Sequence, residues 1–274
     1  MTQRTPPRIY CIPATAAPVV AVFRRGPTRW SHVGRWDLGA SRYEPGAWIG
    51  GRLFPRRSDL SPDGRLLCYF AHKPTATWEH GDAYVALSKL PWLTALHAFG
   101  TCGTWTRGYH FTEDPDDGDA DLAALRLPYG LRAIRPAQFA TERRRGWQEA
   151  PDSPERDPTD MWDQRRNARM FKRRPNGDRV LRVESVGWAG GEWVEQAVDG
   201  LRVRYHLEAR AAIVPLDDVQ WADWDGDGRL LVATRDGHLQ IRDVSTDPPA
   251  IVFDADLSVL EPDPTPAPDW AQRW

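Results

Sequence analysis

Three aspartates near the end of the chain have the spacing of a calcium-binding loop. Asp223, Asp225 and Asp227 alternate with other residues and are followed by Gly228. Ca²⁺ needs several oxygen ligands at short range, and acids that alternate along a turn can supply them. The twelfth position of such a loop is Thr234 instead of Glu, so the bidentate ligand is missing. Turn chemistry explains the motif without an ion, and we predict that the aspartates shape a turn and bind no calcium.

Other patterns that carry chemistry are not visible in the sequence. The seven histidines have no metal-ligand spacing. Ser31 and His32 are adjacent, so they form no opposed nucleophile–base pair, and no glycine pattern of a nucleotide-binding loop is present. His72 and His80 bracket a turn and could face a common cleft, or simply lie on solvated loops. We therefore predict no catalytic residue and no cofactor.

Arginines and tryptophans together suggest a binding surface. Arg24 and Arg25 form a basic cluster, and Trp30, Trp36 and Trp92 are the rings that could lie beside it. Further basic pairs are Arg56-Arg57 and Lys172-Arg173-Arg174. Such side chains can build a groove for an anionic or aromatic partner through cation–π and bidentate contacts. The alternative is a solvated rim of charges at strand ends.

Two nearly identical segments indicate how the chain is built. Residues 59–67 and 223–231 each contain an acidic turn that ends in Gly, then an Arg and an apolar run. This unit predicts a tight reversal before a buried strand, because Gly64 or Gly228 can adopt the left-handed conformation. Residues 22–27 and 170–175 form a second, weaker match. The two matches suggest internal repetition between portions 18–110 and 166–256.

Short apolar segments separated by turns predict sixteen to twenty strands and almost no helix. Thirteen of them are assigned to residue ranges: 19–25, 30–38, 47–54, 65–72, 83–88, 92–99, 104–111, 180–186, 192–198, 201–207, 230–234, 239–243 and 250–253. Charges and prolines crowd residues 141–166, which predicts a solvated loop, a short helix or an ordered partner-binding insertion. We expect an N-terminal arm at 1–17, a single domain at 18–256 that carries this insertion, and an extended tail at 257–274.

The unit Ser61-Pro62-Asp63-Gly64-Arg65-Leu66-Leu67 resembles the blade turn of WD40-type and TolB-type propeller repeats. Scattered segments are similar to an uncharacterised family of bacterial propeller-like proteins: 23–27, 58–70, 88–96 and 221–225. The resemblance implies an all-β, β-propeller-like fold. At four short antiparallel strands per blade, the expected number is four or five blades. The family carries no activity over to this chain.

Composition narrows the class of protein. The 274 residues carry a formal net charge of −2, which disfavours binding to nucleic acid through bulk electrostatics. No apolar stretch is long enough for a spanning helix, so no membrane partner is expected. Three cysteines without a paired framework fit a reducing compartment, and we predict a cytoplasmic protein. Fourteen tryptophans either fill the core or line a binding surface.

These observations favour a non-catalytic interaction module, a scaffold or adaptor of a bacterial cytoplasmic system, with another protein as its partner. A rigid disc with variable loops suits that role. One alternative is a propeller hydrolase or lyase with a central metal or acid site. Another is a small-molecule or glycan binder that uses stacked tryptophans.

Overall fold

The structure is a computed structural model. It describes residues 6–26, 29–74, 81–101, 103–105, 108–134, 138–157, 159, 163, 165–188, 199–209 and 212–274. The chain divides into two compact units. Unit 1 comprises Met1–Tyr10 and Ala137–Leu260, and unit 2 comprises Cys11–Pro136 and Glu261–Trp274. The division falls within the first strand.

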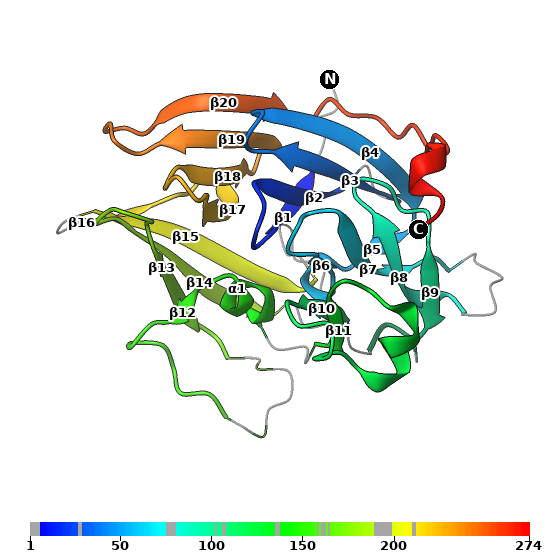
Figure 1. The fold of residues 1–274 in the computed structure, drawn as a ribbon. Helices are drawn as coiled ribbons and strands as arrows, with labels where there is room; N and C mark the ends of the chain where they lie inside the picture. The colour runs from blue at the N-terminus through cyan, green and yellow to red at the C-terminus, as the bar shows by residue number, and fades with distance from the viewer. Residues whose placement is uncertain are drawn as a thin grey trace. The chain divides into compact units, whose positions relative to one another are not determined.

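Three antiparallel sheets are assigned to the first half of the chain (Figure 1). The first sheet has the order β1-β2-β3-β4, with strands Arg8–Pro13, Val19–Arg25, Trp30–Asp37 and Arg42–Gly50. The second has the order β5-β7-β8-β9, with β6 also paired to β7; the strands are Arg52–Leu53, Asp59–Leu60, Leu66–His72, Ala83–Lys89 and His97–Gly100. Strands β10 (Tyr109–Thr112) and β11 (Gly130–Ala133) form a separate ribbon. Short 3₁₀ turns lie at Pro55–Arg57, Gly103–Trp105, Ala120–Leu125 and Asp269–Ala271.

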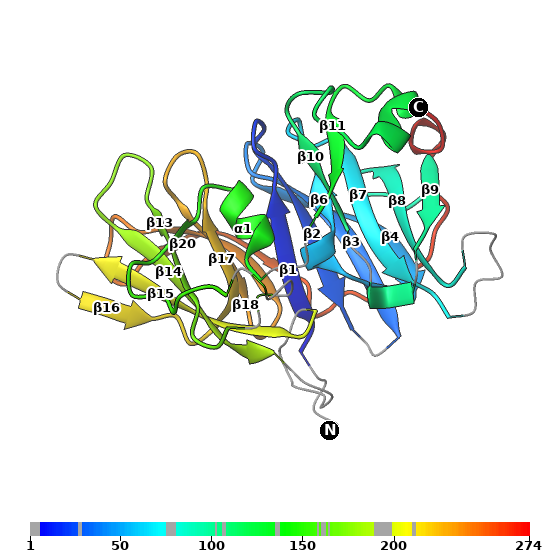
Figure 2. The same cartoon turned by 90° about the horizontal axis from the view of Figure 1, so that it is seen from below.

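Two further sheets belong to unit 1, and Figure 2 shows them from below. One has the order β12-β13-β14-β15-β16, with strands Gln148–Glu149, Arg169–Arg173, Val180–Trp188, Leu201–Ala209 and Ala212–Pro215. The other has the order β17-β18-β19-β20, with strands Val219–Trp224, Leu230–Thr234, His238–Asp243 and Ala250–Asp256. The short helix α1 (Ala140–Arg144) precedes β12. Neighbouring strands follow chain order, as in an up-and-down meander.

Each unit has its own hydrophobic core. In unit 2, Cys68, Phe70, Val85 and Leu87 are completely buried. In unit 1, Leu181, Val183, Leu230 and Val232 and their neighbours form the corresponding cluster. Strands β7 and β18 are buried along nearly their whole length on both faces, which explains their continuous apolar runs. The expectation that each of these runs is a buried strand is confirmed, while their equivalence in different propeller blades stays a prediction.

The two matching sequence segments fold into closely similar turns. One turn joins β6 to β7 and the other joins β17 to β18. Gly64 has φ +72° and Gly228 has φ +77°, the left-handed conformation that the sequence predicts. At the start of each turn a side-chain oxygen, Ser61 Oγ or Asp225 Oδ1, accepts backbone N–H bonds from the residues that follow. The local turn chemistry is confirmed, while repetition of whole portions stays a prediction.

The fold is all-β, with five antiparallel sheets of two to five strands among the described residues. Several strands differ from expectation in their bounds. The strand expected at 92–99 begins only at His97, because Trp92 N–H closes a turn onto Lys89 O and the Tyr69 hydroxyl binds Leu93 O. The strand expected at 104–111 begins at Tyr109, after a 3₁₀ turn. The strand expected at 192–198 lies outside the described residues.

The expected arm at 1–17 contains β1. Its run Ile9-Tyr10-Cys11-Ile12 is completely buried, so the energy of apolar burial explains why this part of the chain is a strand. The expected tail is irregular over 261–268 and then forms the 3₁₀ turn Asp269–Ala271. A single domain over 18–256 stays a prediction, as does the propeller arrangement of the sheets.

Candidate functional site

The three aspartates of the calcium-like motif do not converge. Asp223 is buried, and its Oδ1 accepts a bond of 2.6 Å from Lys172 Nζ. Asp225 is held by Arg229, with 2.6 Å between Arg229 Nε and Asp225 Oδ2. The Asp227 side chain is 80 % exposed and lies 3.5 Å from Arg229 Nη2. The structure therefore gives each carboxylate a different environment, and two of them have a basic partner in close contact.

Arg24 makes the expected cation–π contact, but with a different tryptophan and inside the protein. Arg24 is buried in β2, and its guanidinium carbon lies 5.3 Å from the centre of the Trp48 ring. His32 stacks against the same ring at 4.5 Å and bonds the Tyr43 hydroxyl through Nε2. Burial lowers the pKa of His32 to about 4, so the ring is neutral at pH 7. This stack belongs to the packing of the first sheet.

The remaining candidates of the predicted groove differ in how far they are exposed. Trp36 is completely buried, which corrects its assignment as a ring that a partner could contact. Trp30 is half-buried at the start of β3, where its ring lies beside Gly50. Arg25 is partly exposed at the end of β2. Trp92 is partly exposed in the turn after β8. Hydrophobic packing accounts for Trp36, and only the other side chains retain exposed surface.

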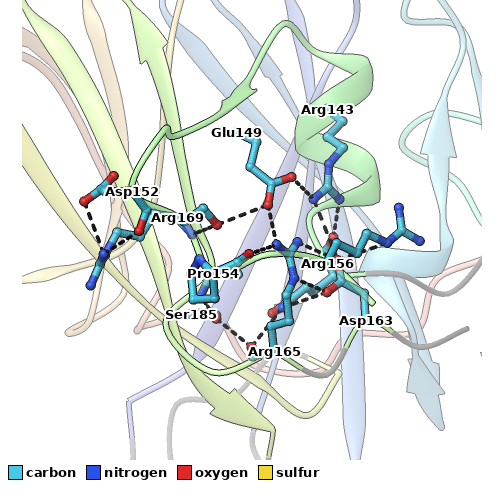
Figure 3. A network of polar contacts seen from close by, with 12 residues as sticks. Arg143, Glu149, Asp152, Pro154, Arg156, Asp163, Arg165, Arg169 and Ser185 are labelled. Carbon is cyan, nitrogen blue, oxygen red and sulfur yellow. Dashed lines mark hydrogen bonds and ion pairs between the residues drawn. The ribbon is translucent and has the colours of Figure 1, made fainter. Parts of the chain in front are cut away.

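The charged insertion contains an ionic network with a buried centre (Figure 3). The Asp163 side chain is 0 % exposed. Arg165 donates two hydrogen bonds to it, at 2.6 Å from Nε to Oδ1 and at 3.0 Å from Nη2 to Oδ2. Arg143 and Arg156 approach Asp163 Oδ2 at 3.7 and 3.9 Å. Arg165 also donates through Nη1 to Glu149. This network ties the loop after β12 to the residues just before β13.

The network keeps both of its central acids ionised. Burial alone would raise the pKa of Asp163, but hydrogen bonds and charge from Arg165 outweigh burial and lower it. The pKa of Glu149 is lowered in the same way, with Arg143 as a second donor. Every atom of the Arg165 guanidinium that donates has an acceptor within the network or at Pro154 O. Because each charge at the centre of the cluster has a partner of opposite charge, we interpret the cluster as a structural element that stabilises the conformation of the insertion.

Among the aromatic residues whose exposure the structure describes, the two most exposed lie in the segment expected to be an extended tail. Trp270 is 53 % exposed and Trp274 is 59 % exposed, with the exposed Arg273 between them. The 3₁₀ turn Asp269–Ala271 presents them at the red end of the chain in Figure 1. We call residues 269–274 the Trp–Arg turn. It combines the residue types that dominate the centres of protein interfaces.

A lysine of β8 anchors the backbone of the Trp–Arg turn. Lys89, the last residue of β8, donates from Nζ to Trp270 O at 2.9 Å and to Arg273 O at 2.7 Å. A lysine that caps free carbonyls at the end of a helical turn also stabilises its dipole. Beneath the turn, Ala271 is completely buried. The backbone of the turn is held in place, whereas each tryptophan is more than half exposed.

A sequence signal for the Trp–Arg turn exists in hindsight. Two tryptophans four residues apart with an arginine between them are unusual in a segment otherwise rich in proline and aspartate. The high Pro and Asp content of the segment predicted an extended tail, so these residues were not predicted as a binding surface. The anchoring lysine could not be found, because it lies 181 residues from Trp270 in sequence.

Within the part of the chain that the structure describes, no group of three or more His, Cys, Asp or Glu side chains is arranged to hold a metal ion. No helix among those residues is both long and apolar enough to cross a membrane. Cys11 and Cys68 are buried free thiols, and burial raises the pKa of both. His72 lies 3.4 Å from Asp82, while His80 lies outside the described residues.

Comparison with known proteins does not assign the chain to a family. A scan against family models, a search of curated proteins and a search of solved structures each gave no match. The resemblance to bacterial propeller-like proteins therefore stays an expectation, and function has to be argued from the geometry.

Proposed function

We propose that this chain is a non-catalytic interaction module that holds a protein partner through the Trp–Arg turn. The observation that carries the proposal is the pair of rings, Trp270 and Trp274, each more than half exposed on a backbone that Lys89 anchors. Exposed large aromatic side chains cost solubility, and a fixed backbone lowers the entropy cost of binding. Both features suit a preformed contact surface.

The rings could supply most of the energy of such a contact. Burying the exposed part of one tryptophan removes roughly 100 Å² of mostly apolar surface, which contributes about 2–3 kcal/mol. Arg273 adds a planar donor that can bind a carboxylate or stack on an aromatic ring. Two such rings and one arginine match the few residues that carry most of the energy in typical interfaces.

Paired substitution tests the proposal. Trp270→Ala with Trp274→Ala should abolish co-purification of the partner from the cells that produce the protein. The free energy of unfolding should stay within about 1 kcal/mol of wild type, because surface substitutions rarely cost more. Val259→Ala is the matched control, since Val259 is 61 % exposed and lies in unit 1. Equal capture of the same proteins by all three forms would contradict the proposal.

The same rings favour a second candidate, a glycan or small-molecule binder that stacks its ligand on tryptophan. Titration with a panel of oligosaccharides separates the two, because stacking on an exposed ring changes its fluorescence. A saturable change that disappears in Trp270→Ala would favour the glycan binder. The hydrolase or lyase alternative predicts turnover in a screen of phosphoester, ester, lactone and glycoside substrates that one Asp or His substitution removes.

We also propose that the four- and five-stranded sheets are blades of a propeller-like fold in a cytoplasmic protein. Support comes from the meander order of the sheets and from the similar turns at Gly64 and Gly228. A crystal structure tests the arrangement: sheets ranged around a common axis are expected, and two separate sandwiches would contradict it. Fractionation of the producing cells tests the compartment, with recovery in the soluble intracellular fraction as the expected result.

A further inference from the structure

A cavity of about 400 Å³ lies within the loop that connects β10 to β11 in unit 2. Ligand sites in proteins have volumes of about 300–1,000 Å³, and a sphere of 400 Å³ is about 9 Å across, the scale of one amino acid. The apolar part of the lining includes Leu122, Leu127, Leu131 and the Tyr129 ring. The polar part includes Asp116 and Arg126.

The walls of this cavity are fixed by the fold itself. Leu131 is buried in the unit 2 core, and Leu122, Leu127 and Tyr129 pack against the same core. Backbone bonds close the loop, with Asp114 O accepting from Gly130 N at 3.2 Å. A Cβ on Gly130 would lie 2.5 Å from that same oxygen, so the loop requires glycine there. The cavity is therefore preformed.

Three charged side chains line the cavity, and none of them has an ion-pair partner among the described residues. Asp119 Oδ2 accepts a bond of 3.2 Å from Ala133 N–H, whereas the exposed side chains of Asp116 and Arg126 make no side-chain hydrogen bond within the described ranges. Arg126 ends the 3₁₀ turn Ala120–Leu125 in a left-handed conformation, with φ +48°, that is unusual for a residue with a side chain. It makes no ion pair within the described ranges, and neither does Asp116. The neighbouring Asp117, in contrast, binds Arg132 at 2.7 Å. Strained residues of this kind often cluster at ligand sites.

We propose that this cavity binds a free apolar α-amino acid. The ligand carboxylate would bind the Arg126 guanidinium, and its ammonium group would bind the Asp116 carboxylate. Its side chain would lie on Leu122, Leu127 and Tyr129. A zwitterion satisfies both free charges at once, whereas a simple acid or amine satisfies only one. This inference is independent of the proposed partner binding, because the cavity and the Trp–Arg turn share no residue.

Three probes of nearly equal shape test the assignment by calorimetry on the full chain. Phenylalanine carries both charges, phenethylamine lacks the carboxylate and 3-phenylpropionate lacks the ammonium group. Phenylalanine should bind about 10-fold more tightly than either, since one charge-assisted contact is typically worth that factor. Arg126→Gln should remove the advantage over phenethylamine, and Asp116→Asn should remove the advantage over 3-phenylpropionate.

Two variants provide the controls. Arg29→Gln removes an arginine from a turn outside the cavity and should leave all three affinities unchanged. Ala123→Trp places a large ring in the cavity wall and should abolish binding of every probe, while the circular dichroism spectrum stays that of wild type. The proposal is overturned if neither phenylalanine nor leucine binds at about 10 mM, if the three probes bind equally, or if Arg126→Gln and Asp116→Asn leave the affinities unchanged.

Discussion

Replacing Asp163 with asparagine should destabilise unit 1 strongly, although the change is nearly isosteric. The Asp163 side chain is completely buried, and its two shortest contacts are bonds of 2.6 and 3.0 Å from Arg165 (Figure 3). Removing one partner of a buried ion pair typically costs 3–5 kcal/mol. Arg165 keeps Glu149 and Pro154 O as acceptors, so we expect about 3 kcal/mol, at the lower end of that range.

Thermal unfolding measures this cost. For a unit of this size, 3 kcal/mol corresponds to a fall in Tm of about 10 °C. Asp152→Asn is the matched control, because Asp152 pairs with Arg169 at 3.1 Å but its side chain is 63 % exposed. An exposed pair contributes at most about 1 kcal/mol. If both variants lower Tm equally, the network around Asp163 does not stabilise the insertion more than an exposed ion pair does.

The pH dependence gives an independent check. The pKa of Asp163 is lower in the folded protein than in the unfolded chain, where it is about 3.9. The stability that this group contributes is therefore fully present above about pH 5 and is lost as the pH falls through the folded pKa. The difference in unfolding free energy between wild type and Asp163→Asn should be constant from pH 5 to 8 and shrink below about pH 4. A difference that grows on acidification would refute the reasoning.

Two further substitutions test other contacts. Lys89→Met removes both bonds to the carbonyls of the Trp–Arg turn, so limited proteolysis should cut the tail faster than in wild type, with a change in stability of only about 1 kcal/mol; unchanged cleavage would mean that Ala271 alone holds the turn. Gly34→Ala would place a Cβ 2.2 Å from the Tyr43 hydroxyl and should cost about 2 kcal/mol in denaturant unfolding. Gly39→Ala is its control, since the nearest atom there is 3.5 Å away, and an equal cost in the two variants would contradict this account.

The parts of the fold that depend on local chemistry could be predicted from the sequence. The Gly64 and Gly228 turns follow from residues within five positions of each other, and the apolar runs after them are the buried strands β7 and β18. Strands β2 and β3 lie at the expected ranges 19–25 and 30–38, apart from one residue, and pair with each other. Alternating apolar residues and turn residues predicted the strand bounds less well where other hydrogen bonds replace the backbone hydrogen bonds between strands. The segment after β8 is an example.

The candidate site depends on contacts between distant residues, and sequence reasoning missed it for that reason. An Arg–Trp contact was expected and one occurs, but the buried Arg24 of β2 contacts Trp48 of β4, two strands away in the same sheet. The role of Asp163 depends on arginines from both ends of the charged insertion. In each case the residue types were visible, and only the fold decides which of them meet and which remain in solvent.

Site-specific photo-crosslinking tests the central claim most directly. A benzophenone amino acid is placed at position 270, or at position 259 as the exposed control, and the protein is irradiated in the cells that produce it. We predict one discrete crosslinked partner from position 270, none from position 259, and loss of the product when Trp274 and Arg273 are both replaced by alanine. Identical patterns from the two positions, or no product from position 270, would contradict the claim that the Trp–Arg turn is an interaction surface.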